Sequence, residues 1–207
     1  MNDVFGPGSN VEKRLVSNYE ELTRRIEACR SLGFKIVATS GTYDLLHEGH
    51  CAYLEKAKLS VDSDPNNVIL VVGLDSDEKV MLRKKRKPIG DQDGRLRTLC
   101  HIRHVDLVIV KNVGDERRAF IKAIKPDVLV ISQTTRHSNN YKDEVAQWCA
   151  KIVELEPQAT TSTTARIRKA IVGFRDPLEA KVDQIHKELK GVIAEIFGDQ
   201  IVGGGQK

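Results

Sequence analysis

The chain has 207 residues, of which 40% are hydrophobic and 30% charged, a length that suits one α/β domain with an appended helix but is short for a two-domain enzyme. Its net charge of +4 is modest, and no apolar run approaches the ~20 residues of a membrane-spanning helix, so we expect a soluble protein with no membrane partner. Its four cysteines form no C-x-x-C pair, which favours buried thiols in a reducing cytoplasm over disulfides or a zinc site.

Residues 1–16 read as a flexible lead-in without the pattern of a secretory signal. Ser17-Asn-Tyr-Glu20 has the spacing of a capping box, and it predicts a helix that runs to about Leu32 and is ended by Gly33. Beyond it, short β-branched runs alternate with helical stretches. Strands are predicted near 35–39, 68–73, 107–110, 128–132 and 151–155, and helices near 49–59, 92–102, 115–124, 142–149 and 163–172.

The predicted strands are mostly apolar, as expected of strands covered on both faces. The alternation predicts an α/β fold with a five-stranded, doubly wound parallel sheet of the Rossmann type over residues 17–173. In such folds the ligand binds beyond the carboxyl ends of the strands.

Residues 174–207 differ in character from the rest. Asp176-Pro-Leu-Glu179 is a second capping signal with Pro177 at the first helical position, and residues 203–207 are expected to be disordered. The predicted helix carries one apolar stripe, which either packs on the parent domain or forms a short coiled-coil-like seam in a homodimer. The stripe consists of Leu178, Val182, Ile185, Leu189, Val192 and Ile196.

The segment most informative about function is Ile36-Val-Ala-Thr-Ser-Gly-Thr-Tyr-Asp-Leu-Leu-His-Glu-Gly-His50, a strand that runs through a Gly-Thr turn into a helix. A helix N-terminus presents unpaired N–H groups and a partial positive charge, so it attracts phosphate, and Gly49 lets a triphosphate approach the backbone. His47 and His50 are three residues apart and lie on one face of the helix, where both can donate hydrogen bonds to one phosphate group.

We expect these histidines to stabilise the transition state of nucleotidyl transfer rather than to act as nucleophiles. An acceptor that is itself a phosphate already carries an anionic oxygen and needs no dedicated base. The alternative is that two histidines near a helix start are structural or bind a metal. The preceding strand and turn favour the phosphate site.

Gly41-Thr-Tyr-Asp-Leu-Leu-His-Glu-Gly-His50 resembles the signature of the cytidylyltransferase-like nucleotidyltransferases, which include glycerol-3-phosphate cytidylyltransferase, archaeal-type FAD synthetase and the nucleotidyltransferase domain of ADP-heptose synthase. The resemblance extends over about residues 17–171 and is greatest to the last of these. It implies the same Rossmann-like fold, with both histidines binding the triphosphate.

The resemblance also implies further site residues. Lys84 and Arg86 match a basic loop that reaches the acceptor and the triphosphate, and Asp44 is assigned to the acceptor. A hydroxyl run ahead of Arg166 and Arg168 matches an Ile-Ser-Thr-Thr signature; which of these arginines faces phosphate is left open. The predicted nucleotide-binding residues are Gly41, Thr42, Tyr43, Gly49, Arg95, Arg103, Thr161, Ser162, Thr163 and Thr164.

One segment departs from the family pattern. Relatives place a Gly-Asp or Gly-Gly-Asp segment after the fourth strand, whereas residues 131–140 here read Ile-Ser-Gln-Thr-Thr-Arg-His-Ser-Asn-Asn. This segment follows a strand at the carboxyl edge of the sheet, so we expect it to set the choice of acceptor, with the Arg136 guanidinium facing a phosphate or carboxylate.

The sequence therefore predicts transfer of a nucleoside monophosphate from ATP or CTP to a small phosphorylated acceptor, with release of pyrophosphate. No carboxylate cluster marks a metal cage, and Mg²⁺ is expected to arrive with the triphosphate. ATP with a sugar phosphate is preferred by resemblance, CTP with a polyol or amino-alcohol phosphate follows, and a catalytically idle nucleotide sensor is the alternative of another class. The basic run 83–87 lacks interleaved aromatics, which favours phosphate handling over nucleic-acid binding.

Overall fold

The computed structural model describes residues 11–61, 63–133, 135, 140–158 and 163–197. The chain divides into two compact units, residues 1–160 and 161–207. None of the described helices combines the length and apolarity needed to cross a membrane.

The first unit is built on one parallel sheet with the strand order β1-β4-β3-β2-β5-β6. The chain runs from the central strand β2 outward through β3 to β4, then returns to the other side of β2 for β5 and β6. This reversal beside β2 is the switch point of a doubly wound fold, and it confirms the predicted architecture. The strands are β1 (Leu15–Val16), β2 (Lys35–Gly41), β3 (Val68–Asp75), β4 (Leu107–Lys111), β5 (Val128–Ser132) and β6 (Lys151–Leu155).

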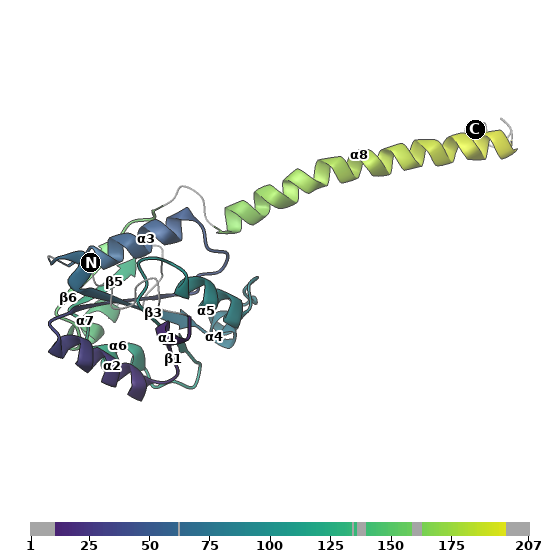
Figure 1. The fold of residues 1–207 in the computed structure, drawn as a ribbon. Helices are drawn as coiled ribbons and strands as arrows, with labels where there is room; N and C mark the ends of the chain where they lie inside the picture. Colours follow the sequence, from purple (N-terminus) through teal and green to yellow (C-terminus); the bar gives the residue numbers. More distant parts are fainter. Residues whose placement is uncertain (1–10, 62, 134, 136–139, 159–162, 198–207) are drawn as a thin grey trace. The chain divides into compact units, whose positions relative to one another are not determined.

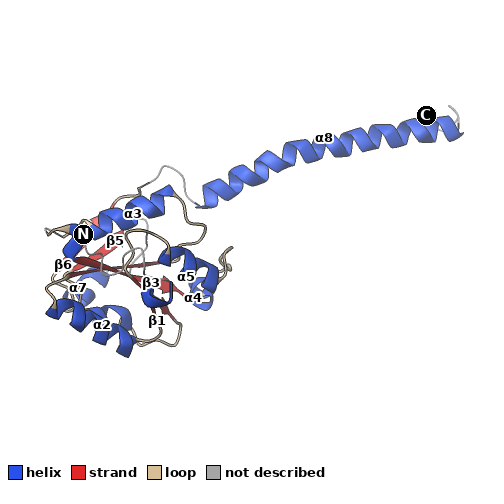
Figure 2. Ribbon diagram, in the orientation of Figure 1, coloured by secondary structure: helices blue, strands red, loops and turns tan. Residues whose placement is uncertain are grey.

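Helices cover both faces of this sheet and alternate with its strands (Figures 1 and 2). On one face lie α2 (Tyr19–Ser31), α6 (Ala119–Ile124) and α7 (Tyr141–Ala146); on the other lie α3 (Glu48–Lys58) and α5 (Gln92–Cys100). The remaining elements are α1 (Val11–Arg14), the 3-10 turn η1 (Pro65–Asn67), α4 (Asp77–Lys84) and α8 (Thr163–Phe197).

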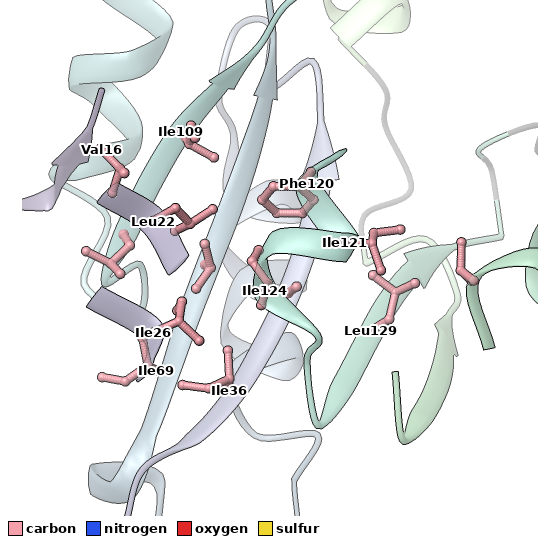
Figure 3. Packing of buried hydrophobic residues seen from close by; sticks show 14 of the residues in the cluster. Val16, Leu22, Ile26, Ile36, Ile69, Ile109, Phe120, Ile121, Ile124 and Leu129 are labelled. Atoms are coloured by element: carbon pink, nitrogen blue, oxygen red, sulfur yellow. The ribbon is translucent and has the colours of Figure 1, made fainter. Parts of the chain in front are cut away.

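Successive strand residues point to opposite faces, so each strand feeds two cores. In β3, Ile69 and Val71 pack with α2 and α6, whereas Leu70, Val72 and Leu74 pack with α3 and α5. Figure 3 shows the first of these cores, where Leu22 and Ile26 of α2 and Phe120, Ile121 and Ile124 of α6 lie over Ile36, Ile69 and Leu129. These interlocked cores fix the carboxyl edge of the sheet, where the site is built.

The sequence prediction missed one strand, so the sheet has six strands rather than five. Leu15 and Val16, placed in the predicted lead-in, pair with Val108 and Ile109 of β4. A two-residue strand has no periodicity to detect, because its pairing comes from the neighbouring strand.

Some helices also differ from the prediction. Asn18, not Ser17, caps α2 by accepting a hydrogen bond from the Glu21 N–H, and the Glu21 carboxylate in turn accepts one from the Ser17 N–H. A further helix, α4, begins after the Ser76 cap and contains the first part of the predicted basic loop. Gly33 ends the α2 region in the left-handed conformation, with φ of +86°, as predicted.

The described part of the second unit, residues 163–197, is one helix, α8, of 35 residues. The predicted helix start at Asp176 is wrong, because Pro177 lies inside this continuous helix. Proline removes one backbone hydrogen bond, yet the flanking turns continue. The stripe from Leu178 to Ile196 lies along its second half and is exposed within the unit.

Removal of residues 174–207 should leave the first unit folded, because all core residues identified among the described positions lie between 11 and 155. We expect a cooperative melt within a few degrees of the full chain. If the stripe forms a homodimer seam, light scattering should show a dimer for the full chain and a monomer for the truncated one. A non-cooperative melt of the truncated chain would contradict the expected independence.

Candidate active site

The two signature histidines lie at the start of α3, beyond the carboxyl end of β2. His47 is the N-cap residue, and its Nδ1 accepts a hydrogen bond from the Gly49 N–H at 3.1 Å. Nδ1 must present a lone pair to do so, which places the proton of the neutral ring on Nε2. The capping bond thereby selects the tautomer that can donate through Nε2.

His50 lies beside His47, with 4.1 Å between the ring centroids. Both side chains are partly exposed, and both belong to the first turn of α3, where the helix dipole favours an anion. The two imidazoles and a helix N-terminus therefore lie together, and their joint contact with one phosphate group stays a prediction.

The turn between β2 and α3 is conformationally strained. Tyr43 and Leu45 have φ values of 49° and 48°, which cost about 1–3 kcal/mol each in residues with a side chain. The Tyr43 ring is buried and lies so close to Gly41 that a Cβ there would meet it at 3.1 Å. Burial also raises the pKa of the Tyr43 phenol well above its usual value. The lack of a side chain at Gly41 thus leaves room for the Tyr43 ring in the turn.

Asp44 is buried, and it ties this turn to the basic loop. Its Oδ1 accepts hydrogen bonds from the N–H groups of Ile89 and Gly90, at 2.9 and 3.1 Å, and its Oδ2 faces the Arg86 guanidinium at 3.3 Å. These contacts hold Arg86 near the histidine turn. The hydrogen bonds give Asp44 a structural role, and its predicted contact with the acceptor stays a prediction.

Arg95 lies almost wholly inside the protein, at 3% exposure. Its guanidinium donates to the backbone carbonyls of Gly90, Thr42 and Asp75 and to the Asp77 carboxylate. It therefore joins the basic loop, the histidine turn and the end of β3. The sequence assigned Arg95 to the nucleotide; the structure places its donors on the protein's own backbone beneath the turn.

A charge cluster that the sequence analysis did not identify surrounds Asp75, at the end of β3. Arg83 Nη2 lies 2.9 Å and Lys111 Nζ 3.3 Å from its carboxylate, which is 1% exposed. Burial lowers the pKa of Lys111, against the opposing effect of Asp75. Arg83 Nη2 also donates to the Thr42 hydroxyl at 2.8 Å. A signal existed in the sequence, since an aspartate ending a buried strand requires a cationic partner.

Lys84 lies in the last turn of α4, next to Arg83. Partial burial, and then the charges of Arg83 and Arg86, lower its pKa. Lys85 follows in the left-handed conformation and ends the helix, so Arg86 belongs to the loop rather than to the helix. The predicted basic loop is thus half helix and half loop.

Other predicted site residues are not brought to this cluster. Arg103 lies in the turn before β4, at the amino edge of the sheet and therefore opposite the histidines. Arg136, Thr161 and Ser162 lie outside the described residues. Thr163 and Thr164 begin α8 in the second unit, and their side chains are not described. The contacts expected of these residues stay predictions.

No group of three or more histidine, cysteine, aspartate or glutamate side chains suited to a metal ion occurs in the part of the chain that the structure describes. The two buried carboxylates beside the turn, Asp44 and Asp75, face arginine and lysine side chains.

A parallel doubly wound sheet with paired histidines at a helix start, beyond its central strand, is typical of α/β proteins that bind phosphate groups. The cytidylyltransferase-like family model matches residues 38–190, and the chain belongs to this family. The match spans the histidine turn, the basic loop and the hydroxyl run, so it confirms the resemblance seen in the sequence.

Among similar proteins are the bifunctional proteins HldE. That of Methylobacillus flagellatus is 35% identical over 156 residues, covering 74% of this chain and 30% of the relative. That of Campylobacter concisus is 34% identical over 171 residues, covering 82% of this chain and 34% of the relative. The chain thus spans about a third of the length of these relatives.

A similar fold and a similar sequence also occur in a solved structure. The lipopolysaccharide core biosynthesis protein from Thermoplasma volcanium GSS1 superposes with a TM-score of 0.51 at 26% identity, covering 60% of this chain and 98% of that one.

Proposed function

We propose that this chain is a nucleotidyltransferase that transfers a nucleoside monophosphate from ATP or CTP to a small phosphorylated acceptor and releases pyrophosphate. The observation that carries the proposal is the pair of imidazoles 4.1 Å apart at the N-terminus of α3, beside the Gly41–Thr42 turn. Membership of the cytidylyltransferase-like family supports the same class of reaction.

The proposed chemistry needs stabilisation of charge more than proton transfer. The acceptor phosphate oxygen attacks the α-phosphorus, the bond to the β-phosphate breaks, and pyrophosphate carries away the electron pair. His47 donates through Nε2, and with His50 and the α3 N-terminus it stabilises the charge on the phosphate oxygens. Mg²⁺ carried with the triphosphate would neutralise part of its charge.

A sugar phosphate is the preferred acceptor and ATP the preferred donor. This preference rests on the resemblance to ADP-heptose synthase, on the HldE relatives and on the name of the Thermoplasma protein, which refers to lipopolysaccharide core biosynthesis. CTP with a polyol or amino-alcohol phosphate is the second candidate, favoured by the family signature.

The test is pyrophosphate release from each of four nucleoside triphosphates against a panel of sugar, polyol and amino-alcohol phosphates, with Mg²⁺ present. The proposal requires release that depends on both the nucleotide and the acceptor. Nucleotide binding without turnover across the panel would favour an idle sensor instead.

The basic residues give a more specific prediction. Lys84→Ala and Arg86→Ala should each raise the Michaelis constant for nucleotide or acceptor by roughly 10–100-fold, the usual range for a lost charged hydrogen bond. Raised salt should likewise weaken the binding of substrate by the parent protein. The control is Lys56→Ala, in the last turn of α3 and exposed. If both variants keep the Michaelis constants of the parent, the basic run 83–87 is a solvated surface that does not bind substrate.

A further inference from the structure

Arg83 stands apart from the basic residues expected to reach a ligand, because its guanidinium contacts two residues of the site itself. It is the next-to-last residue of α4, and its Nη2 lies 2.8 Å from Thr42 Oγ1 and 2.9 Å from Asp75 Oδ2. We propose that Arg83 is a positioning residue that fixes the Thr42 hydroxyl as a hydrogen-bond donor to the nucleotide phosphate. This inference rests on the proposed function, because it takes Thr42 to contact the nucleotide.

The direction of the Arg83–Thr42 hydrogen bond is determined by chemistry. A guanidinium has five donors and no acceptor, so the Thr42 oxygen must accept. A threonine hydroxyl has one proton, and that proton is then directed away from Arg83. Thr42 directly follows β2 and is 6% exposed, so its surroundings hold the side chain in place. An oriented hydroxyl at this turn suits an anionic phosphate oxygen, since it donates without reorganisation.

The partner of Arg83 explains why its head group stays in place. Asp75 ends β3 and pairs in register with Lys111 at the end of β4. Lys111 donates a hydrogen bond to Asp75 Oδ1, whereas the approach of Arg83 to Oδ2 is a charge contact outside hydrogen-bond geometry. Two cations therefore face this buried carboxylate. Its charge in turn holds Arg83 against Thr42, although the Arg83 side chain is 46% exposed.

The position of Lys111 is itself fixed by packing. Its stem passes over Gly73, where an added Cβ would lie 2.6 Å from Lys111 Cδ, and its ammonium lies 5.7 Å from the centre of the Phe120 ring. Asp75 therefore has a partner that cannot swing out to solvent. Arg83 is held by a preformed anion rather than by a flexible surface pair.

The test is a double-mutant cycle between Arg83→Gln and Thr42→Val, read as kcat/KM for the nucleotide in the pyrophosphate-release reaction. Glutamine removes the charge, and valine keeps the shape of threonine without its hydroxyl. Each single variant should lose roughly tenfold, and the double variant should be no worse than Thr42→Val alone, because Arg83 acts through that hydroxyl. Arg83→Lys should recover most of the loss, since an ammonium can also donate to Thr42.

Three results would overturn the positioning role. If the losses in kcat/KM multiply in the double variant, Arg83 contacts the nucleotide directly. A parent-like kcat/KM for Thr42→Val, or no recovery in Arg83→Lys, would also contradict it. Arg97→Gln, on the exposed face of α5, is the control and should match the parent. Melting temperatures of all variants exclude misfolding as the cause. An absence of pyrophosphate release by the parent protein with every substrate pair would instead count against the proposed function.

Discussion

Replacement of His50 or His47 by alanine should lower kcat by about 10²–10³-fold, the usual cost of losing one preorganised donor to a developing charge. The two rings lie side by side at the start of α3, where a phosphate group can meet both. The measurement is steady-state pyrophosphate release at saturating nucleotide and acceptor. Retention of near-full turnover by either variant would show that the reaction centre lies elsewhere.

His47 allows a sharper version of this experiment, because it has a second role as the helix cap. His47→Ala should also lose about 1 kcal/mol of unfolding free energy, whereas His47→Asn should keep the cap, since asparagine is among the preferred N-cap residues. Both variants lack the Nε2 donor, so both should be slow. An active His47→Asn variant would mean that His47 contributes by capping α3 and not by donating to phosphate.

Arg95→Met should lower the unfolding free energy by an amount on the order of 3–5 kcal/mol, because it strips the donors from the carbonyls of Gly90, Thr42 and Asp75 at a buried position. The measurement is chemical denaturation. We also expect loss of turnover, since the same bonds hold the histidine turn against the basic loop.

The matched control for this prediction is Arg97→Met, two residues along α5. Arg97 is exposed and pairs with Asp93 one turn away, a contact of little energetic value, so the unfolding free energy of this variant should stay close to that of the parent. If Arg95→Met is as stable as Arg97→Met yet binds nucleotide poorly, Arg95 is a ligand contact, as the sequence suggested, rather than a structural tie.

Together these variants separate two readings of the site. Loss of turnover with nucleotide binding intact in the histidine variants would support an enzyme in which the imidazoles act on the transition state. If the parent protein binds nucleotide but never releases pyrophosphate, the result would support a sensor built on the same fold.

The sequence by itself determined the order of the main strands and helices and the position of the histidine motif. The apolar strands 68–73 and 128–132 and the turn before His47 are local patterns, written in consecutive residues, so they can be recognised without knowledge of the fold. The same holds for Gly33, whose left-handed conformation is a property of one residue.

The tertiary structure decided which distant side chains meet. Thr42, Asp75 and Arg83 come from a turn, a strand end and a helix end, and Arg95 reaches the same turn across 53 positions of sequence. It also separated Arg103 from the site, since residues that precede a parallel strand lie at the opposite edge from those that follow one. Such contacts depend on strand order and on the side-chain rotamers that packing permits, and neither is encoded in the spacing of residues along the chain.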